Sequence, residues 1–104
     1  DSQRYQYEKK VLQAFKEVND AVISYTSANK TVELMENLKD ASRKYVELAL
    51  FQHINGHISY IDVLDAQRSY LNAEIDLTHA VRDEYIALIE LYKALGGGWR
   101  GEKQ

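Results

Sequence analysis

The chain has 104 residues, no proline, no cysteine and a formal net charge of −3, so it forms one domain or part of one. The absence of cysteine excludes disulfides and thiolate sites, and the slight acidity without a basic stripe argues against nucleic acid as a partner. No run of 18 apolar residues occurs, so no transmembrane helix is expected, and Asp1-Ser2-Gln3 is not expected to begin a signal peptide.

The first predicted element is a helix over about residues 3–53. Apolar residues recur there at steps of three and four, which places them on one face of a helix. The predicted stripe consists of Val11, Phe15, Val18, Val22, Tyr25, Val32, Met35, Leu38, Tyr45 and Leu48. Polar side chains between Ser24 and Thr31 compete for backbone hydrogen bonds and weaken the helix. A continuous helix is favoured, and a break capped by Thr31 is the alternative.

A turn over about residues 54–59 follows, marked by Gly56, the first glycine of the chain. Glycine adopts a positive φ without steric cost, so Gly56 suits the end of a helix. Ser59 and Asp62 are three residues apart, which is the spacing of a capping box at the start of a second helix. Residues at this turn form the tip of a hairpin, where the chain can contact another protein.

The second helix is predicted over about residues 60–95. Its stripe consists of Leu64, Leu71, Ile75, Val81, Tyr85, Leu88 and Leu95, with Ala66, Ala73 and Ala80 as smaller packing positions. We predict that Gly96 adopts the left-handed conformation and ends the helix. Residues 96–104 then form a glycine-rich end and a polar tail, in which Trp99 anchors the chain end against neighbouring structure.

The predicted fold class is all-α: a long antiparallel two-helix coiled-coil hairpin. Further apolar residues lie off both stripes, namely Leu12, Ala21, Leu34, Leu50, Leu77, Ile86, Ile89 and Leu91. Two helices cannot cover both sets, so the hairpin is expected to pack against more helices, from copies of itself or from a larger protein. In isolation it is expected to complete a helical bundle by self-association.

Three segments resemble the C-terminal repeat of TolC-type outer membrane efflux proteins, in the order and approximate spacing of that family. They are residues 13–21 (QAFKEVNDA), 56–68 (GHISYIDVLDAQR) and 91–99 (LYKALGGGW). The resemblance implies a homotrimer in the outer membrane of a Gram-negative bacterium. Each protomer of this family has two repeats, and each repeat joins a membrane β-hairpin to long periplasmic helices.

The resemblance implies that this chain is the periplasmic helical pair after the last barrel strand, a fragment of a channel that exports small molecules. The implied partners are a periplasmic adaptor protein at the tip and an inner-membrane pump in the assembled system. The implied adaptor-facing tip consists of Asn55, Gly56, His57 and Ser59. Asp62 and Asp65 match two acidic residues that form a ring at the tunnel constriction in some members.

In those members a tyrosine and an arginine help to hold the entrance closed. The matching positions here are His53 and Ile58, which depart from that network. Asp62 also has a plainer interpretation, because a helix-capping role alone explains its position.

Catalysis and metal binding have little support in the sequence. His53 and His57 have the spacing of a metal pair, but Gly56 separates them and a metal site needs further ligands. No nucleophile motif or phosphate loop occurs, so neither an enzyme nor a cofactor is expected. The alternative function is a free-standing coiled-coil interaction module that dimerises into a four-helix bundle. A third, a metal-binding helical bundle enzyme, lacks the required Glu-x-x-His pairs.

Overall fold

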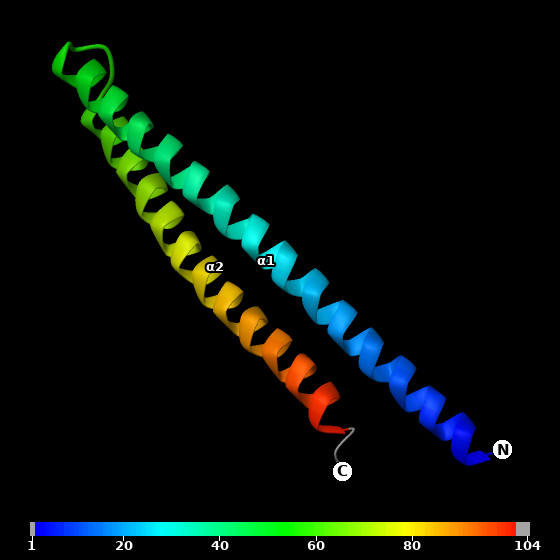
Figure 1. Cartoon of the computed structure of the whole chain (residues 1–104). Helices are drawn as coiled ribbons and strands as arrows, with labels where there is room; N and C mark the ends of the chain where they lie inside the picture. The colour runs from blue at the N-terminus through cyan, green and yellow to red at the C-terminus, as the bar shows by residue number, and fades with distance from the viewer. Residues whose placement is uncertain (1, 102–104) are drawn as a thin grey trace. The chain divides into compact units, whose positions relative to one another are not determined.

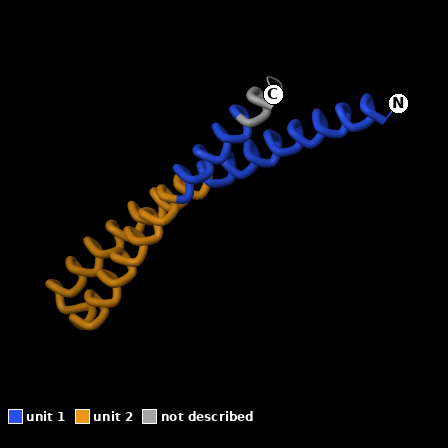
Figure 2. The backbone as a smooth tube through the Cα atoms, turned by 90° about the horizontal axis from the view of Figure 1, so that it is seen from below, with its two compact units in different colours: residues 1–29, 83–104 blue, residues 30–82 orange. Residues whose placement is uncertain are grey.

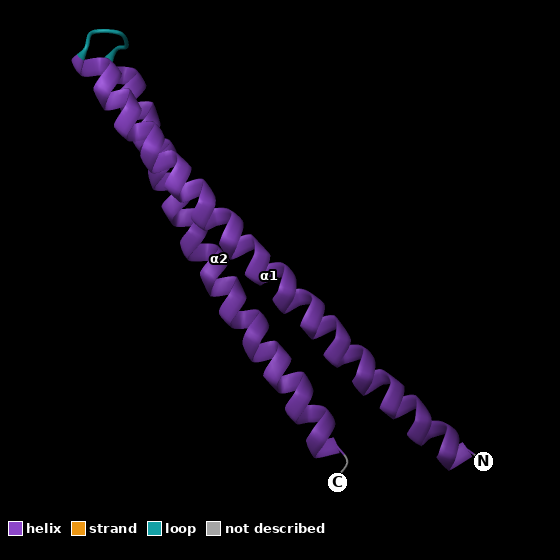
Figure 3. Cartoon of the chain, turned by 45° about the horizontal axis from the view of Figure 1, so that its top comes forward, coloured by secondary structure: helices purple, strands orange, loops and turns teal. Residues whose placement is uncertain are grey.

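The computed structural model describes residues 2–101, with side chains described through residue 96. It contains two antiparallel helices, α1 (Ser2–Ile54) and α2 (Tyr60–Gly101), joined by a short loop (Figures 1 and 3). The described part of the chain contains no strand. The all-α hairpin prediction is therefore confirmed. The continuous first helix is confirmed too, because α1 passes without interruption through residues 24–31.

The chain divides into two compact units, and each unit pairs a stretch of α1 with a stretch of α2 (Figure 2). Unit 1 contains residues 1–29 and 83–104, and unit 2 contains residues 30–82 with the loop. Within α1 the division follows Asn29, inside the polar stretch in which a weak helix was predicted. The helix nevertheless stays intact at this point.

Small residues dominate the contact between the helices of unit 2. The buried residues there are Val32, Ala49, Val63, Ala66, Ala73 and Ala80. Together with half-buried residues they follow steps of three and four along each helix, which is the heptad pattern of a coiled coil. We call these positions the seam of unit 2: residues 32, 35, 39, 42, 46 and 49 of α1, and residues 63, 66, 70, 73, 77 and 80 of α2.

Unit 1 continues the same heptad pattern with half-buried residues. Its seam consists of Ala14, Val18, Ala21, Tyr25 and Ala28 on α1, and Glu84, Ala87, Leu91 and Ala94 on α2. A polar contact joins the two helices here, because the amide Nδ2 of Asn29 donates a hydrogen bond to Oε2 of Glu84 at 2.9 Å. Every seventh residue of α2 from Ala66 to Ala94 is alanine. Alanine lets helices approach closely, because the interaxial distance depends on the side chains at the contact.

The predicted stripes were wrong in part. Val18, Tyr25, Val32 and Met35 do lie in the seams, and Ala66, Ala73 and Ala80 are packing positions as predicted. Most of the larger residues are exposed instead: Val11, Phe15, Val22, Leu38, Tyr45 and Leu48 on α1, and Leu64, Leu71, Ile75, Tyr85 and Leu95 on α2. Periodicity finds an apolar face but does not say which neighbour covers it, and these helices have more than one such face.

The predicted end of the second helix was also wrong. α2 continues past Leu95 to Gly101, and Gly96 does not take the positive φ expected of a helix cap. Glycine permits the left-handed conformation without requiring it, so a run of glycines weakens a helix but does not have to stop it. The anchoring role predicted for Trp99 concerns a side chain outside the described part of the chain. Residues 102–104 of the predicted tail also lie outside it.

The helical conformation of Gly96 leads us to predict that alanine at this position stabilises the chain. An added Cβ at this position meets no atom within 4 Å, and alanine is about 1 kcal/mol better than glycine inside a helix. We expect Gly96→Ala to raise the free energy of unfolding by up to about 1 kcal/mol, measured by urea unfolding of the chain with circular dichroism. Lower stability of the variant would instead indicate the left-handed cap that the sequence predicted.

Candidate functional site

The loop between the helices begins with a helix-ending motif built around Gly56. This glycine has a φ of 78°, the positive value that the sequence predicted. Its N–H donates a hydrogen bond to the carbonyl of His53 at 2.9 Å, and the N–H of His57 donates to the carbonyl of Gln52 at 2.8 Å. This pair of bonds is the Schellman motif, which satisfies carbonyls that the last turn of a helix leaves free.

Side chains of the loop complete the two helix ends. The amide Nδ2 of Asn55 donates to the carbonyl of Phe51 at 2.8 Å, so this side chain closes the end of α1. At the start of α2, Oγ of Ser59 donates to Oδ2 of Asp62 at 3.3 Å. The predicted capping box therefore needs correction, because the two residues meet through their side chains instead of through reciprocal bonds to the backbone. The backbone N–H of Asp62 donates to the carbonyl of Ser59 at 3.1 Å.

The structure brings the predicted tip residues together at one end of unit 2. Asn55, Gly56, His57 and Ser59 are all exposed. Sequence reasoning missed three exposed apolar side chains beside them: Phe51 is 66% exposed, Ile54 is 80% exposed and Ile61 is 68% exposed. The signal was present in the sequence, because these apolar residues lie close to Gly56 and outside the stripes predicted for the two helices.

In unit 2, α2 presents three different faces along its length. One face is the seam. A second carries exposed apolar side chains at most of its heptad positions, with Arg68 at the position between them, and we call it the apolar face of α2: Ile61, Leu64, Leu71 and Ile75. A third, the acidic face, consists of Asp62, Asp65, Ser69, Asn72, Asp76 and His79, all exposed. The two candidate constriction residues, Asp62 and Asp65, thus share one polar face near the loop.

The α1 helix of unit 2 has a second apolar face as well. Leu34, Leu38, Ala41, Tyr45 and Leu48 follow steps of four and three, and all five are exposed. We call this set the outer stripe of α1. At 3.6 residues per turn its centre lies roughly 100° around the helix from the centre of the seam. A helix with two apolar stripes at this separation can pack against two neighbours at once.

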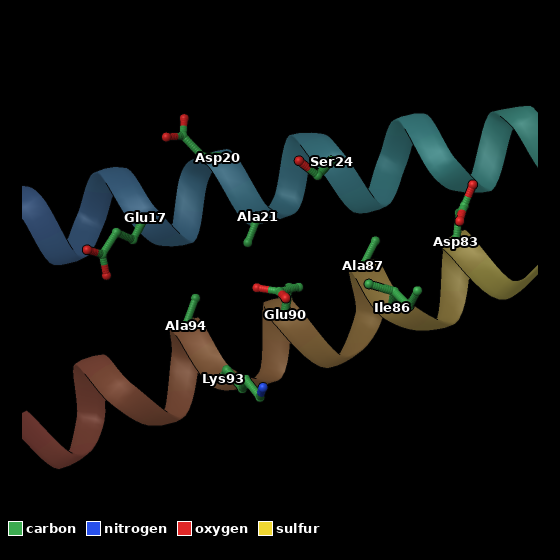
Figure 4. Close-up of a pocket in the computed structure, with 10 residues that line it drawn as sticks. All are labelled: Glu17, Asp20, Ala21, Ser24, Asp83, Ile86, Ala87, Glu90, Lys93 and Ala94. Atoms are coloured by element: carbon green, nitrogen blue, oxygen red, sulfur yellow. The ribbon is translucent and has the colours of Figure 1, made fainter.

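Unit 1 contains a groove between its two helices. Ala21 of α1 and Ala87 and Ala94 of α2 point into the space between the helices (Figure 4). Other lining residues are mostly charged: Glu17, Asp20, Asp83, Glu90 and Lys93. Within the described residues, no group of three or more histidine, cysteine, aspartate or glutamate side chains could hold a metal ion. Of the two histidines considered as ligands, His53 is half-buried and His57 is exposed.

Comparison with known proteins identifies the family. Within its described residues, neither helix is both long and apolar enough to span a lipid bilayer. Residues 1–97 match the family described as outer membrane efflux protein. The chain belongs to this family. The resemblance seen in the sequence is therefore confirmed, and the helices are a periplasmic part of an outer membrane efflux protein.

Relatives of this efflux protein segment come from several Gram-negative bacteria. A solvent efflux pump outer membrane protein, SrpC of Pseudomonas putida, is 37% identical over 93 residues, which cover 89% of this chain and 20% of that protein. Outer membrane protein OprJ of Pseudomonas aeruginosa is 33% identical over 99 residues, covering 95% and 21% respectively. Cation efflux system protein CusC of Escherichia coli is 37% identical over 99 residues, covering 90% and 20%.

The chain spans about a fifth of the length of the curated relatives that it matches. No solved structure matches it significantly.

Proposed function

We propose that this segment forms part of the tunnel wall of a trimeric outer membrane efflux channel, and that its loop faces a periplasmic adaptor protein. The observation that carries this proposal is the division of exposed side chains in unit 2 into apolar and acidic faces. A helix in the wall of a water-filled tunnel needs apolar faces toward neighbouring helices and a polar face toward the lumen. The faces of α1 and α2 fit that requirement.

The apolar faces supply the lateral contacts of such a wall. The outer stripe of α1 keeps heptad spacing, and the apolar face of α2 follows it except at Arg68, so each suits packing against another helix by the knobs-into-holes mode. Exposed apolar side chains gathered on one face of a helix mark an interaction surface. The neighbours are helices of the remaining part of the protomer and of two further copies. The same faces explain why the isolated segment is expected to self-associate.

In this proposal the acidic face of α2 lines the lumen of the tunnel. In a trimer, Asp62 and Asp65 would place six carboxylates around the tunnel near its periplasmic end, where they form the constriction. Rings of acidic side chains attract cations and favour their passage. The channel carries out no catalytic step in this proposal, and no cofactor is required.

The exposed loop residues Asn55, Gly56, His57 and Ser59 form the adaptor-facing tip, and an inner-membrane pump completes the assembled system. The substrates are small molecules, because the relatives are named for the efflux of solvents, of toluene and of cations.

Charge removal at the constriction tests the tunnel assignment. We expect Asp65→Asn in the full-length trimer to reduce cation selectivity and block by multivalent cations, with little change in stability. Asp62→Asn should reduce both in the same direction and also cost about 0.5 kcal/mol, because Asp62 lies in the first turn of α2. Single-channel recordings in planar bilayers measure selectivity and block directly.

Glu74→Gln is the matched control for these two variants. It removes one charge from an exposed residue of α2 that lies on the side opposite Asp62 and Asp65. We expect its selectivity to equal that of the wild type. Unchanged cation preference and unchanged block in the Asp62→Asn, Asp65→Asn double variant would reject the luminal assignment.

A further inference from the structure

His53 contacts both sides of the loop through three different groups. Its Nδ1 lies 3.0 Å from the carbonyl oxygen of Ile58. Its ring centroid lies 5.5 Å from that of Tyr60, with the planes tilted by 54°, and its own carbonyl accepts the N–H of Gly56 at 2.9 Å. One residue at the end of α1 therefore holds the middle of the loop, the end of the loop and the first residue of α2.

The contact with Ile58 shows which ring nitrogen of His53 carries a proton. A carbonyl oxygen only accepts hydrogen bonds, so Nδ1 of His53 must carry the proton. When the ring is neutral, Nε2 is then unprotonated. None of the backbone hydrogen bonds around the loop ends on the Ile58 carbonyl, and the imidazole supplies a donor for it.

The hydrogen bond from His53 to the Ile58 carbonyl acts on the part of the loop that follows Gly56. The Schellman motif fixes the backbone as far as the N–H of His57, and the side-chain bond between Ser59 and Asp62 acts at the start of α2. Between these two points, Ile58 is held by two contacts: its side chain packs on the cluster of Ala49, Val63 and Ala66, and its carbonyl accepts the hydrogen bond from His53.

We propose that His53 is a positioning residue that holds the loop in one conformation and so presents the exposed tip ready for a partner. The identity of that partner as an adaptor protein rests on the proposed function above. A preformed loop binds with a smaller loss of conformational entropy than a mobile one.

Hydrogen exchange in the full-length channel tests this role directly. We expect His53→Leu to speed amide exchange of Gly56 and His57 by about fivefold, which corresponds to the loss of one hydrogen bond. His53→Asn should restore slow exchange, because its amide N–H can donate to the Ile58 carbonyl in place of Nδ1. His57→Leu is the matched control, since His57 is exposed and closes the loop through its backbone.

Nuclear magnetic resonance gives a second measurement, the protonation of Nδ1, which distinguishes a hydrogen-bonding role of His53 from a purely steric one. Nitrogen-15 spectra of histidine-labelled channel should show His53 protonated at Nδ1, and at Nδ1 alone when the ring is neutral. The proposal is overturned if His53→Leu exchanges at the wild-type rate, if His53→Asn exchanges as fast as His53→Leu, or if Nδ1 is unprotonated.

A cross-linking experiment tests the role of His53 in the loop separately from the proposal that the tip faces an adaptor protein. The chain has no cysteine, so Ile54→Cys beside the loop introduces a single thiol into this segment for capture of the adaptor. Faster exchange together with weaker cross-linking in His53→Leu supports both proposals. Faster exchange with unchanged cross-linking supports the loop-ordering role of His53 and rejects the idea that this order aids the partner. Failure of the Ile54→Cys protein with wild-type His53 to cross-link at all rejects the adaptor-facing tip. Unchanged exchange rejects the role of His53 whatever the cross-linking shows.

Discussion

Replacement of Gly56 by valine should cost about 1–2 kcal/mol of folding free energy, because an L-residue in the left-handed conformation carries a penalty of this size and a β-branched residue is the worst case. The structure shows that the penalty comes from the backbone. Gly56 has a φ of 78°, and an added Cβ would meet no atom within 4 Å. Relief of the strain would break the two hydrogen bonds that end α1. In the proposed full-length channel, Gly56→Val should also weaken adaptor cross-linking and export.

Gly56→Asn is the control for this effect, since asparagine tolerates the left-handed conformation better than other residues with a side chain. Both variants add atoms to the same open space, so they differ mainly in backbone preference. Urea unfolding of the chain should rank wild type first, Gly56→Asn second and Gly56→Val last. Normal export and adaptor cross-linking by Gly56→Val, at normal channel abundance, would contradict the assignment of the tip.

Ala66→Leu should be the most damaging single change in the seam. Ala66 has no exposed area and forms a core cluster with Ala49 and Val63, flanked by Val46 and Ile58. A leucine in so tight a contact forces the helices apart or drives side chains off their preferred rotamers, at a cost of about 1–3 kcal/mol. Loss of stability in urea unfolding, together with less assembled channel in membranes, is the expected result.

Ala41→Leu provides the comparison, because Ala41 is also a helical alanine of unit 2 but is exposed. In the isolated chain this change should leave stability nearly unaltered. Equal stability of Ala66→Leu and Ala41→Leu would show that the seam does not pack as described.

The elements of this fold could be predicted from sequence because their signals are local. The φ of Gly56 follows from the absence of a side chain, and the continuity of α1 follows from its unbroken periodicity. The partner of each face could not be predicted in this way. Phe15 and Leu71 looked like core residues, yet both are exposed. Hydrophobicity shows that a face will be buried without showing by what.

Two features of the site depended on geometry that no pattern displays. The bond from His53 to the Ile58 carbonyl arises from the path of the loop, and the spacing of the two residues alone does not predict it. The spacing of Asp62, Asp65 and Asp76 already places them on one face, but the position of that face beside the seam depends on the burial of Val63 and Ala66, which the sequence did not show. The helical state of Gly96 reflects a small free-energy difference between the low helix propensity of glycine and the gain from extending an existing helix. The amino-acid composition does not show which of the two is larger.

The small residues in the seams between α1 and α2 affect how this protein folds and assembles. Among the described residues, Val63 is the largest side chain that is fully buried. A methyl group removes little apolar area from water compared with leucine or phenylalanine, so the contact between α1 and α2 gives the pair modest stability. Most of the hydrophobic driving force becomes available only when neighbouring helices cover the larger side chains. A newly exported segment should therefore stay sensitive to proteases until those neighbours arrive, and its folding and the assembly of the channel become one concentration-dependent event.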